Sequence, residues 1–175
     1  MIKKKYYVLM VLILTFVVAI FVDSTNKNQY ITNIEKGIKY IESTKKNTAV
    51  ASFFEVERNS SVSMKILYTI TPNEDPQDFN SCIELLSFVK NYPYTTSKSK
   101  GNLEQKIYLM KCVIQIDKNN DTEICHLPIY FNDEFDYFAI PRDYNNRTEE
   151  DSTNLAFYYI SDVKYQQIAK SLFRQ

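Results

Sequence analysis

The sequence predicts an α+β fold: an N-terminal transmembrane helix followed by one compact domain with a mainly antiparallel sheet and about three helices. Three observations predict this class. The chain begins with a long uncharged apolar run, two pairs of alternating segments have the pattern of β-hairpins, and further segments carry apolar residues at helical spacing. The composition, 45% hydrophobic and 24% charged residues, is that of a globular protein.

The N-terminal run is interpreted as a transmembrane signal-anchor helix. Residues 6–22 are 17 residues without a charge, and a helix of that length spans about 25 Å, close to the hydrocarbon thickness of a bilayer. Three lysines precede the run, so we expect residues 1–5 to form a cytoplasmic basic tip and residues 23–175 a single extracytoplasmic domain. The alternative is a cleaved secretory signal, but the run is long and its cleavage site is poorly formed. In either case the domain leaves the cytoplasm.

An amphipathic helix is predicted next, at residues 29–46. Ile31, Ile34, Ile38 and Ile41 follow steps of three and four residues and form one narrow apolar seam. Such a seam can contact a partner helix above the membrane, as in a coiled coil, or it can pack on the sheet of its own domain. We expect packing slightly ahead of partner contact, because the hairpins leave an apolar face that helices must cover.

Two β-hairpins form the centre of the predicted domain. Residues 49–58 and 62–71 alternate with period two around a turn at 59–61, which predicts one buried face. The second hairpin has apolar faces at 108–116 and 125–131, separated by a turn. In the first hairpin, the residues of the second strand that we expect to share a face are Val62, Met64, Ile66, Tyr68 and Ile70. Pro128 in the last strand predicts an edge or bulged position.

The remaining elements are two helices and up to two short strands. Asp75 and Pro76 are typical of a helix start, with Asp75 as cap and Pro76 in the first turn. Residues 135–140 form a possible short strand and residues 155–160 a continuous apolar strand. Ser161 is expected to cap a last amphipathic helix.

A disulfide between Cys112 and Cys125 is predicted from the register of the second hairpin. If residues 117–120 form a four-residue loop, Cys112 stands directly opposite Cys125 on the buried face. Their Cβ atoms would then lie about 4.5–5.5 Å apart, which is close to disulfide reach. An oxidising compartment would make this pair a cross-link; in a reducing one both would be core thiols.

Cys82 and His126 are the leading candidates for a catalytic pair, ahead of the acidic residues Asp133, Glu134 and Asp136. A thiol on a helix and a histidine on a strand can act as nucleophile and base, with Asp133 or Asp136 orienting the imidazole. However, Cys82 lies in the second turn of its helix, on the apolar stripe, and His126 alternates with buried residues. We therefore favour a buried cysteine and a surface histidine.

Composition argues against several other classes of function. Without the three N-terminal lysines, 18 basic residues face 21 acidic ones, so the domain carries about −3, which argues against nucleic acid and anionic lipid as partners. Only two glycines are present, too few for phosphate-binding loops. No CxxC or two-histidine spacing predicts a metal site, and no cofactor is expected.

The function predicted from these observations is a membrane-anchored extracytoplasmic interaction or assembly module. It would be a non-enzymatic subunit or accessory of a larger envelope or membrane complex, with unknown protein partners. The alternative is a small secreted or anchored thiol hydrolase that uses Cys82 and His126.

Overall fold

The computed structural model describes residues 2–43, 48–58, 62–94, 106–118, 121–141 and 155–173. It confirms the α+β class. The elements in chain order are α1 (Ile2–Ser43), β1 (Ala49–Arg58), β2 (Val62–Ile70), α2 (Pro76–Asn91), β3 (Lys106–Lys118), β4 (Asp121–Asn132), β5 (Tyr137–Pro141), β6 (Leu155–Tyr159) and α3 (Val163–Phe173).

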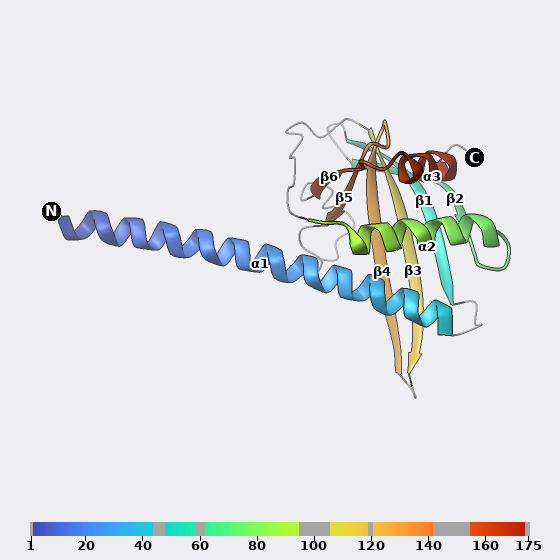
Figure 1. Cartoon of the computed structure of the whole chain (residues 1–175), viewed down its shortest axis with the longest axis horizontal. Coiled ribbons are helices and arrows are strands. Elements are labelled where there is room, and N and C mark those ends of the chain that lie inside the picture. Colours follow the sequence, from blue (N-terminus) through green and yellow to red (C-terminus); the bar gives the residue numbers. More distant parts are fainter. Residues whose placement is uncertain are drawn as a thin grey trace.

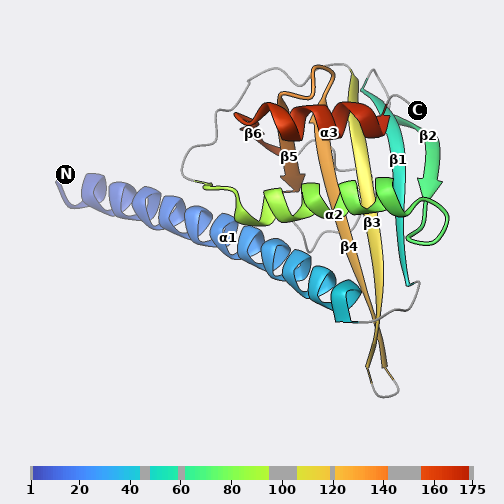
Figure 2. The same cartoon turned by 45° about the vertical axis from the view of Figure 1, so that its right-hand side comes forward.

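The six strands form one antiparallel sheet in the order β2-β1-β3-β4-β5-β6. The helices α2 and α3 and the C-terminal half of α1 cover the same face of this sheet (Figure 1). The N-terminal half of α1 extends away from the domain on the side of β5 and β6, opposite to β2 (Figures 1 and 2). The sheet therefore has one edge strand, β6, on the side from which α1 leaves, and another, β2, on the far side.

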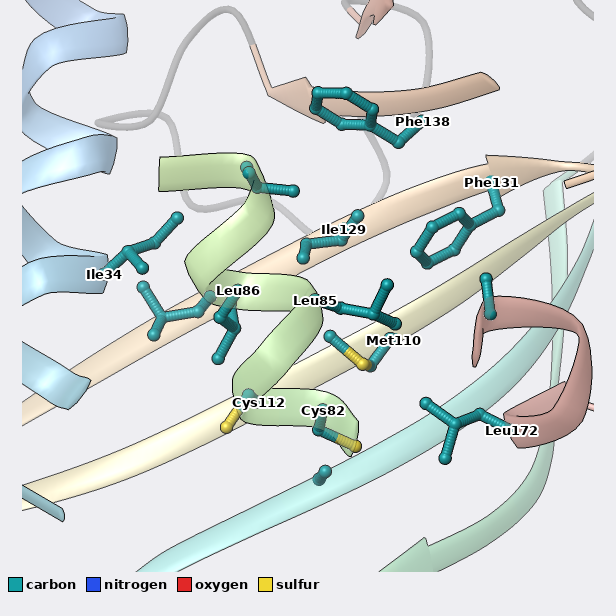
Figure 3. Packing of buried hydrophobic residues seen from close by; sticks show 14 of the residues in the cluster. Ile34, Cys82, Leu85, Leu86, Met110, Cys112, Ile129, Phe131, Phe138 and Leu172 are labelled. Atoms are coloured by element: carbon teal, nitrogen blue, oxygen red, sulfur yellow. The ribbon is translucent and has the colours of Figure 1, made fainter. Parts of the chain in front are cut away.

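The main core lies between the sheet and the helices (Figure 3). Helix α2 contributes its predicted apolar stripe, including Cys82, Leu86 and Val89. The predicted inward faces of β3 and β4 are confirmed, because alternate residues of both strands lie in this core. Its largest fully buried side chains are Tyr30, Phe53, Phe79, Phe131 and Phe138.

The first hairpin buries residues on both faces, so the prediction of one buried face is wrong. Phe53 lies in the helix-covered core, whereas Val56 lies in a second cluster on the opposite face of the sheet. A register shift between Phe53 and Phe54 also divides the predicted common face of β2. Because a bulge reverses the alternation of side chains along β2, Tyr68 and Ile70 lie on the helix-covered face of the sheet. Met64 and Ile66 are exposed. The second cluster consists of Val56, Ile107, Leu109, Tyr130, Ala139 and Leu155.

The register of the second hairpin corrects the disulfide prediction. Cys112 pairs with Leu127 and Ile114 with Cys125, two positions away from the predicted alignment. Pairing continues to Lys118 and Asp121, because the strands are longer and the connection shorter than the four-residue loop that was expected. The three cysteines, all within the described residues, are buried and form no disulfide.

Pro128 lies in β4, between β3 and β5, and so is not in an edge strand. However, β4 pairs with β5 only at Tyr130 and Phe131. The backbone at Pro128 therefore has β3 as its partner on one side, at Lys111, and no β5 residue on the other. A missing N–H costs no ladder hydrogen bond on that open side, which explains why proline is tolerated there.

The helices α2 and α3 start close to the predicted positions, but their capping hydrogen bonds differ from those predicted. Asp75 is the N-cap of α2 and Pro76 follows it as predicted, but the Asp75 side chain makes no capping hydrogen bond. At α3 the cap is one residue later than expected, since Asp162 Oδ1 accepts the N–H of Lys164 at 2.9 Å. The predicted strand at 135–140 begins at Tyr137, because residues 133–136 form the preceding turn.

The helix predicted at 29–46 and the apolar run before it form one uninterrupted helix, α1. Within the part of the chain that the structure describes, no helix combines the length and apolar composition needed to cross a membrane. The side chains of residues 6–10, 16 and 19–22, which belong to the predicted anchor, lie outside the described residues.

Candidate functional site

The structure does not bring the predicted catalytic residues together. Cys82 faces the sheet from α2 and is completely buried in the main core. Cys125 and Leu127 point into the same core from β4. Because successive strand residues point to opposite faces, the side chain of His126 lies on the other side of the sheet from Cys82. The sheet itself separates the proposed nucleophile from the proposed base.

Asp136 also has a structural role rather than an orienting one. Its Oδ1 accepts a hydrogen bond from Asn132 Nδ2 at 2.6 Å, and Asn132 Oδ1 accepts the Tyr137 N–H at 2.9 Å. Asn132 is only 3% exposed. This network closes the turn between β4 and β5, where Phe135 adopts a positive φ of 60° and is buried against Tyr108. Asp136 is thus engaged within its own turn.

Burial raises the pKa values of two core thiols, those of Cys82 and Cys112. The pKa of Cys82 is raised well above its ordinary value, first by desolvation and then by the neighbouring Cys112. Desolvation raises the pKa of Cys112 to about 12. A reactive cysteine needs a lowered pKa and access to solvent. Neither thiol has these properties.

No group of three or more metal-ligating side chains occurs among the described residues. The expectation that the chain holds no metal or cofactor stays a prediction. Asp133 and Glu134 are exposed at the turn before Phe135.

The predicted seam of α1 contacts its own domain. Ile34 and Ile38 are buried in the main core, and Ile31 and Ile41 are partly buried against it. Gly37 lies on the same face, where a Cβ atom would come within 2.6 Å of Ile114 Cδ1. The helix therefore approaches the Ile114 side chain more closely than a Cβ atom at position 37 would allow. The sequence signal for this contact was the glycine within the seam, four residues before Ile41.

Polar contacts fix α1 along the β3–β4 hairpin. Tyr30 Oη donates to the Pro128 carbonyl at 2.5 Å, and Tyr40 Oη accepts the Asp117 N–H at 3.1 Å. Lys36 forms an ion pair with Glu123. Tyr30, which is completely buried, lies one helical repeat before Ile34, so its position on the seam predicts its burial.

The N-terminal half of α1 presents a different surface. Its described apolar side chains are 45–63% exposed, and they form two consecutive runs, at 11–14 and 17–18. Because each residue turns by about 100°, they cover the whole circumference rather than one stripe. These residues are Val11, Leu12, Ile13, Leu14, Val17 and Val18.

Aromatic residues gather where α1 leaves the domain. Lys27 Nζ lies 5.1 Å from the centre of the Tyr94 ring, and that ring packs edge-on against Tyr158 at 4.8 Å. Tyr92 Oη donates to the carbonyl of Tyr159 at 2.8 Å, which ties the end of α2 to β6. The high aromatic content was visible in the sequence, but its concentration at this end was not, because these tyrosines come from two separate segments, the end of α2 and β6.

Comparison with known proteins gives no match: no family model fits the chain, and neither a curated protein nor a solved structure is significantly similar to it.

Proposed function

We propose that the chain is a membrane-anchored extracytoplasmic interaction or assembly module, a non-enzymatic subunit or accessory of a larger envelope or membrane complex. One observation carries the proposal: a single helix changes from apolar all round to apolar on one stripe. A helix that is apolar on every side is suited to lipid, whereas a one-stripe helix is suited to the surface of a domain. Helix α1 joins both without a break.

The anchor part of the proposal rests on the amino-acid sequence of residues 6–22, on the exposure of its described side chains and on the lysines before it. The positive-inside rule then assigns residues 1–5 to the cytoplasm and the domain to the far side. Retention of the anchor is favoured over cleavage, because the helix continues directly into residues that the domain buries.

The interaction part is supported by exposed apolar side chains on the surface of the domain and by the separation of Cys82 from His126. On the edge strand β2, Met64 is 41% exposed and Ile66 is 59% exposed. In the β3–β4 hairpin, Ile124 is 49% exposed. Edge strands with exposed apolar side chains are suited to contact other chains. The thiol-hydrolase alternative is disfavoured, because Cys82 is buried on the opposite side of the sheet from His126.

Topology is tested with protease added outside intact cells or sealed vesicles that contain the full chain. We expect digestion of the domain and protection of an N-terminal fragment. Full protection of the domain would overturn the orientation, and a mature N-terminus near Thr25 would overturn the retained anchor.

The partner is tested with a photo-crosslinking residue at Ile66 in the full chain, in intact cells. We expect a discrete protein adduct at Ile66 and none at Glu57, an exposed polar position on the neighbouring strand. Equal labelling at both positions would contradict a specific surface there.

The enzymatic alternative is tested by treating the native and the denatured chain with a thiol electrophile at neutral pH. Slow native and fast denatured labelling of Cys82 supports the module. Fast native labelling of Cys82 would contradict the proposal and favour a hydrolase.

A further inference from the structure

The end of the domain from which α1 leaves is formed by elements that are distant in sequence. The edge strand β6 and the C-terminal end of α2 lie on this side, in both views (Figures 1 and 2). The contacts described above connect them to α1, from Lys27 through Tyr94 and Tyr158 to β6. This end has a fixed position relative to the helix, because ring contacts and a hydrogen bond link its parts.

The spacing along α1 places this end close to the end of the apolar run. The last apolar residue of the run is Val22, and Lys27, five residues later, contacts the domain through the Tyr94 ring. Five helical steps cover about 7 Å along the axis. The headgroup region on each side of a bilayer is of similar thickness, about 5–7 Å. A helix without a flexible joint gives the domain little room to move away from the bilayer.

The side chains at this end have the chemistry of membrane interfaces. Tyr159 is 45% exposed, its ring lies 5.3 Å from that of Tyr137, and its carbonyl accepts the Tyr92 hydroxyl. Tyrosine rings with one apolar and one polar part gather at the level of lipid headgroups. Among the described strands β6 pairs with β5 alone, so its outer edge offers backbone groups to a polar layer.

We propose that the β6 edge and the C-terminal end of α2 rest on the headgroup region of the extracytoplasmic leaflet, with Tyr159 and Tyr92 as the interfacial contacts. This inference rests on the proposed membrane anchor. It gives the domain a defined orientation in which β6 faces the bilayer and β2, with Met64 and Ile66, points away from it. The surface proposed for a protein partner is then the one that lipid leaves accessible.

The chain contains no tryptophan, so single tryptophans report their own surroundings. The test uses the full chain in phosphatidylcholine vesicles with lipids brominated near the headgroup end of the acyl chain. The reporters are Tyr159→Trp and Asn91→Trp, the second at the exposed last residue of α2, and the matched control is Ile66→Trp on β2. We expect a blue shift and strong quenching for both reporters, and neither for the control.

The outcomes separate this inference from the anchor. If the chain does not float with the vesicles, the proposed anchor fails. If it floats and both reporters keep their emission as Ile66→Trp does, the anchor stands and the seating of the domain is overturned. Equal quenching at all three positions would also overturn it, because the domain would then have no preferred orientation. Circular dichroism of each variant confirms that the fold is retained.

Discussion

The two halves of α1 both carry large apolar residues, but these residues lie in opposite surroundings. Between residues 11 and 18 the described side chains are exposed around the whole helix, whereas Tyr30 and Ile34 are completely buried. The difference is the pattern: consecutive apolar residues cannot all face one sheet, while residues three and four apart can. Hydrophobicity alone therefore does not determine which half of a helix packs on its domain.

Placing a charge in each half of α1 is expected to give the largest difference between the two halves. Ile34→Asp puts a carboxylate into a completely buried site and is expected to cost more than about 4 kcal/mol, a large part of the stability of a domain. Ile13→Asp is expected to leave the domain folded but to weaken its retention in the membrane, because a charge at the centre of a spanning helix is unfavourable. Denaturant unfolding in detergent and membrane fractionation measure the two effects.

Thr32→Asp is the matched control, since Thr32 is exposed on the packed half of the helix. It should leave both stability and retention unchanged. If Ile34→Asp folds normally, or if Ile13→Asp destabilises the domain as strongly, the division of α1 into two environments is wrong.

The close approach at Gly37 gives the next effect in size. Gly37→Leu forces extra atoms between α1 and Ile114 and is expected to destabilise the domain by about 1–3 kcal/mol. Gly37→Ala should cost less, because the terminal methyl of Ile114 can move and alanine favours the helix by about 1 kcal/mol. Thermal or denaturant unfolding compares both with Asn28→Leu at an exposed position. Equal stability of all three variants would contradict the close approach.

The dependence of stability on high pH tests the burial of Cys112 in the core that α1 covers. The thiol of Cys112 has an ordinary pKa of 9.0 and a folded pKa of about 12. Above pH 9 the unfolded chain loses this proton while the folded chain keeps it, so stability falls with rising pH. The expected slope is about 1.4 kcal/mol per pH unit for Cys112, with Cys82 adding to it. Unfolding curves between pH 7 and pH 11 measure this slope in the wild type and in Cys112→Ala, which should be less stable at pH 8 but should lose less above pH 9.

The smallest expected effect concerns the two tyrosine hydroxyls that hold α1. Tyr30→Phe leaves the Pro128 carbonyl without its partner in a partly buried site and should cost about 1 kcal/mol. Tyr40→Phe removes an exposed contact to Asp117 and should change stability by less than about 0.5 kcal/mol. A larger loss for Tyr40→Phe would place the main attachment of α1 at the hairpin turn instead of at Pro128. Denaturant unfolding of both variants measures the difference.

The sequence predicted the elements better than their alignment. Both hairpins, the start of α2 at Asp75 and Pro76 and the inward faces of β3 and β4 followed from period and turn chemistry. The disulfide between Cys112 and Cys125 did not, because a shift of the register by two keeps every side chain on the same face. The alternation of apolar residues therefore could not distinguish the observed pairing of Cys112 with Leu127 from the predicted one.

For the candidate site, the sequence predicted that Cys82 is buried and that His126 lies on the face of its strand opposite Cys125. The strand alternation already assigned His126 to the face opposite Cys125, and the apolar stripe of α2 already included Cys82. The tyrosine contacts where α1 leaves the domain were not predictable, because they join α1, the end of α2 and β6 through side chains about 65 residues or more apart in the chain.

By itself the sequence determined the α+β class, the apolar run at residues 6–22 and the seam from Ile31 to Ile41, since these depend on local composition and on the fixed periods of helix and strand. Only the tertiary structure decided that the seam meets its own domain, that the β3–β4 register separates Cys112 from Cys125, and that β6 lies on the side from which the N-terminal half of α1 extends. Each of these is a choice between arrangements with the same local pattern. Long-range packing makes that choice, through contacts such as Gly37 against Ile114 and Tyr30 against Pro128.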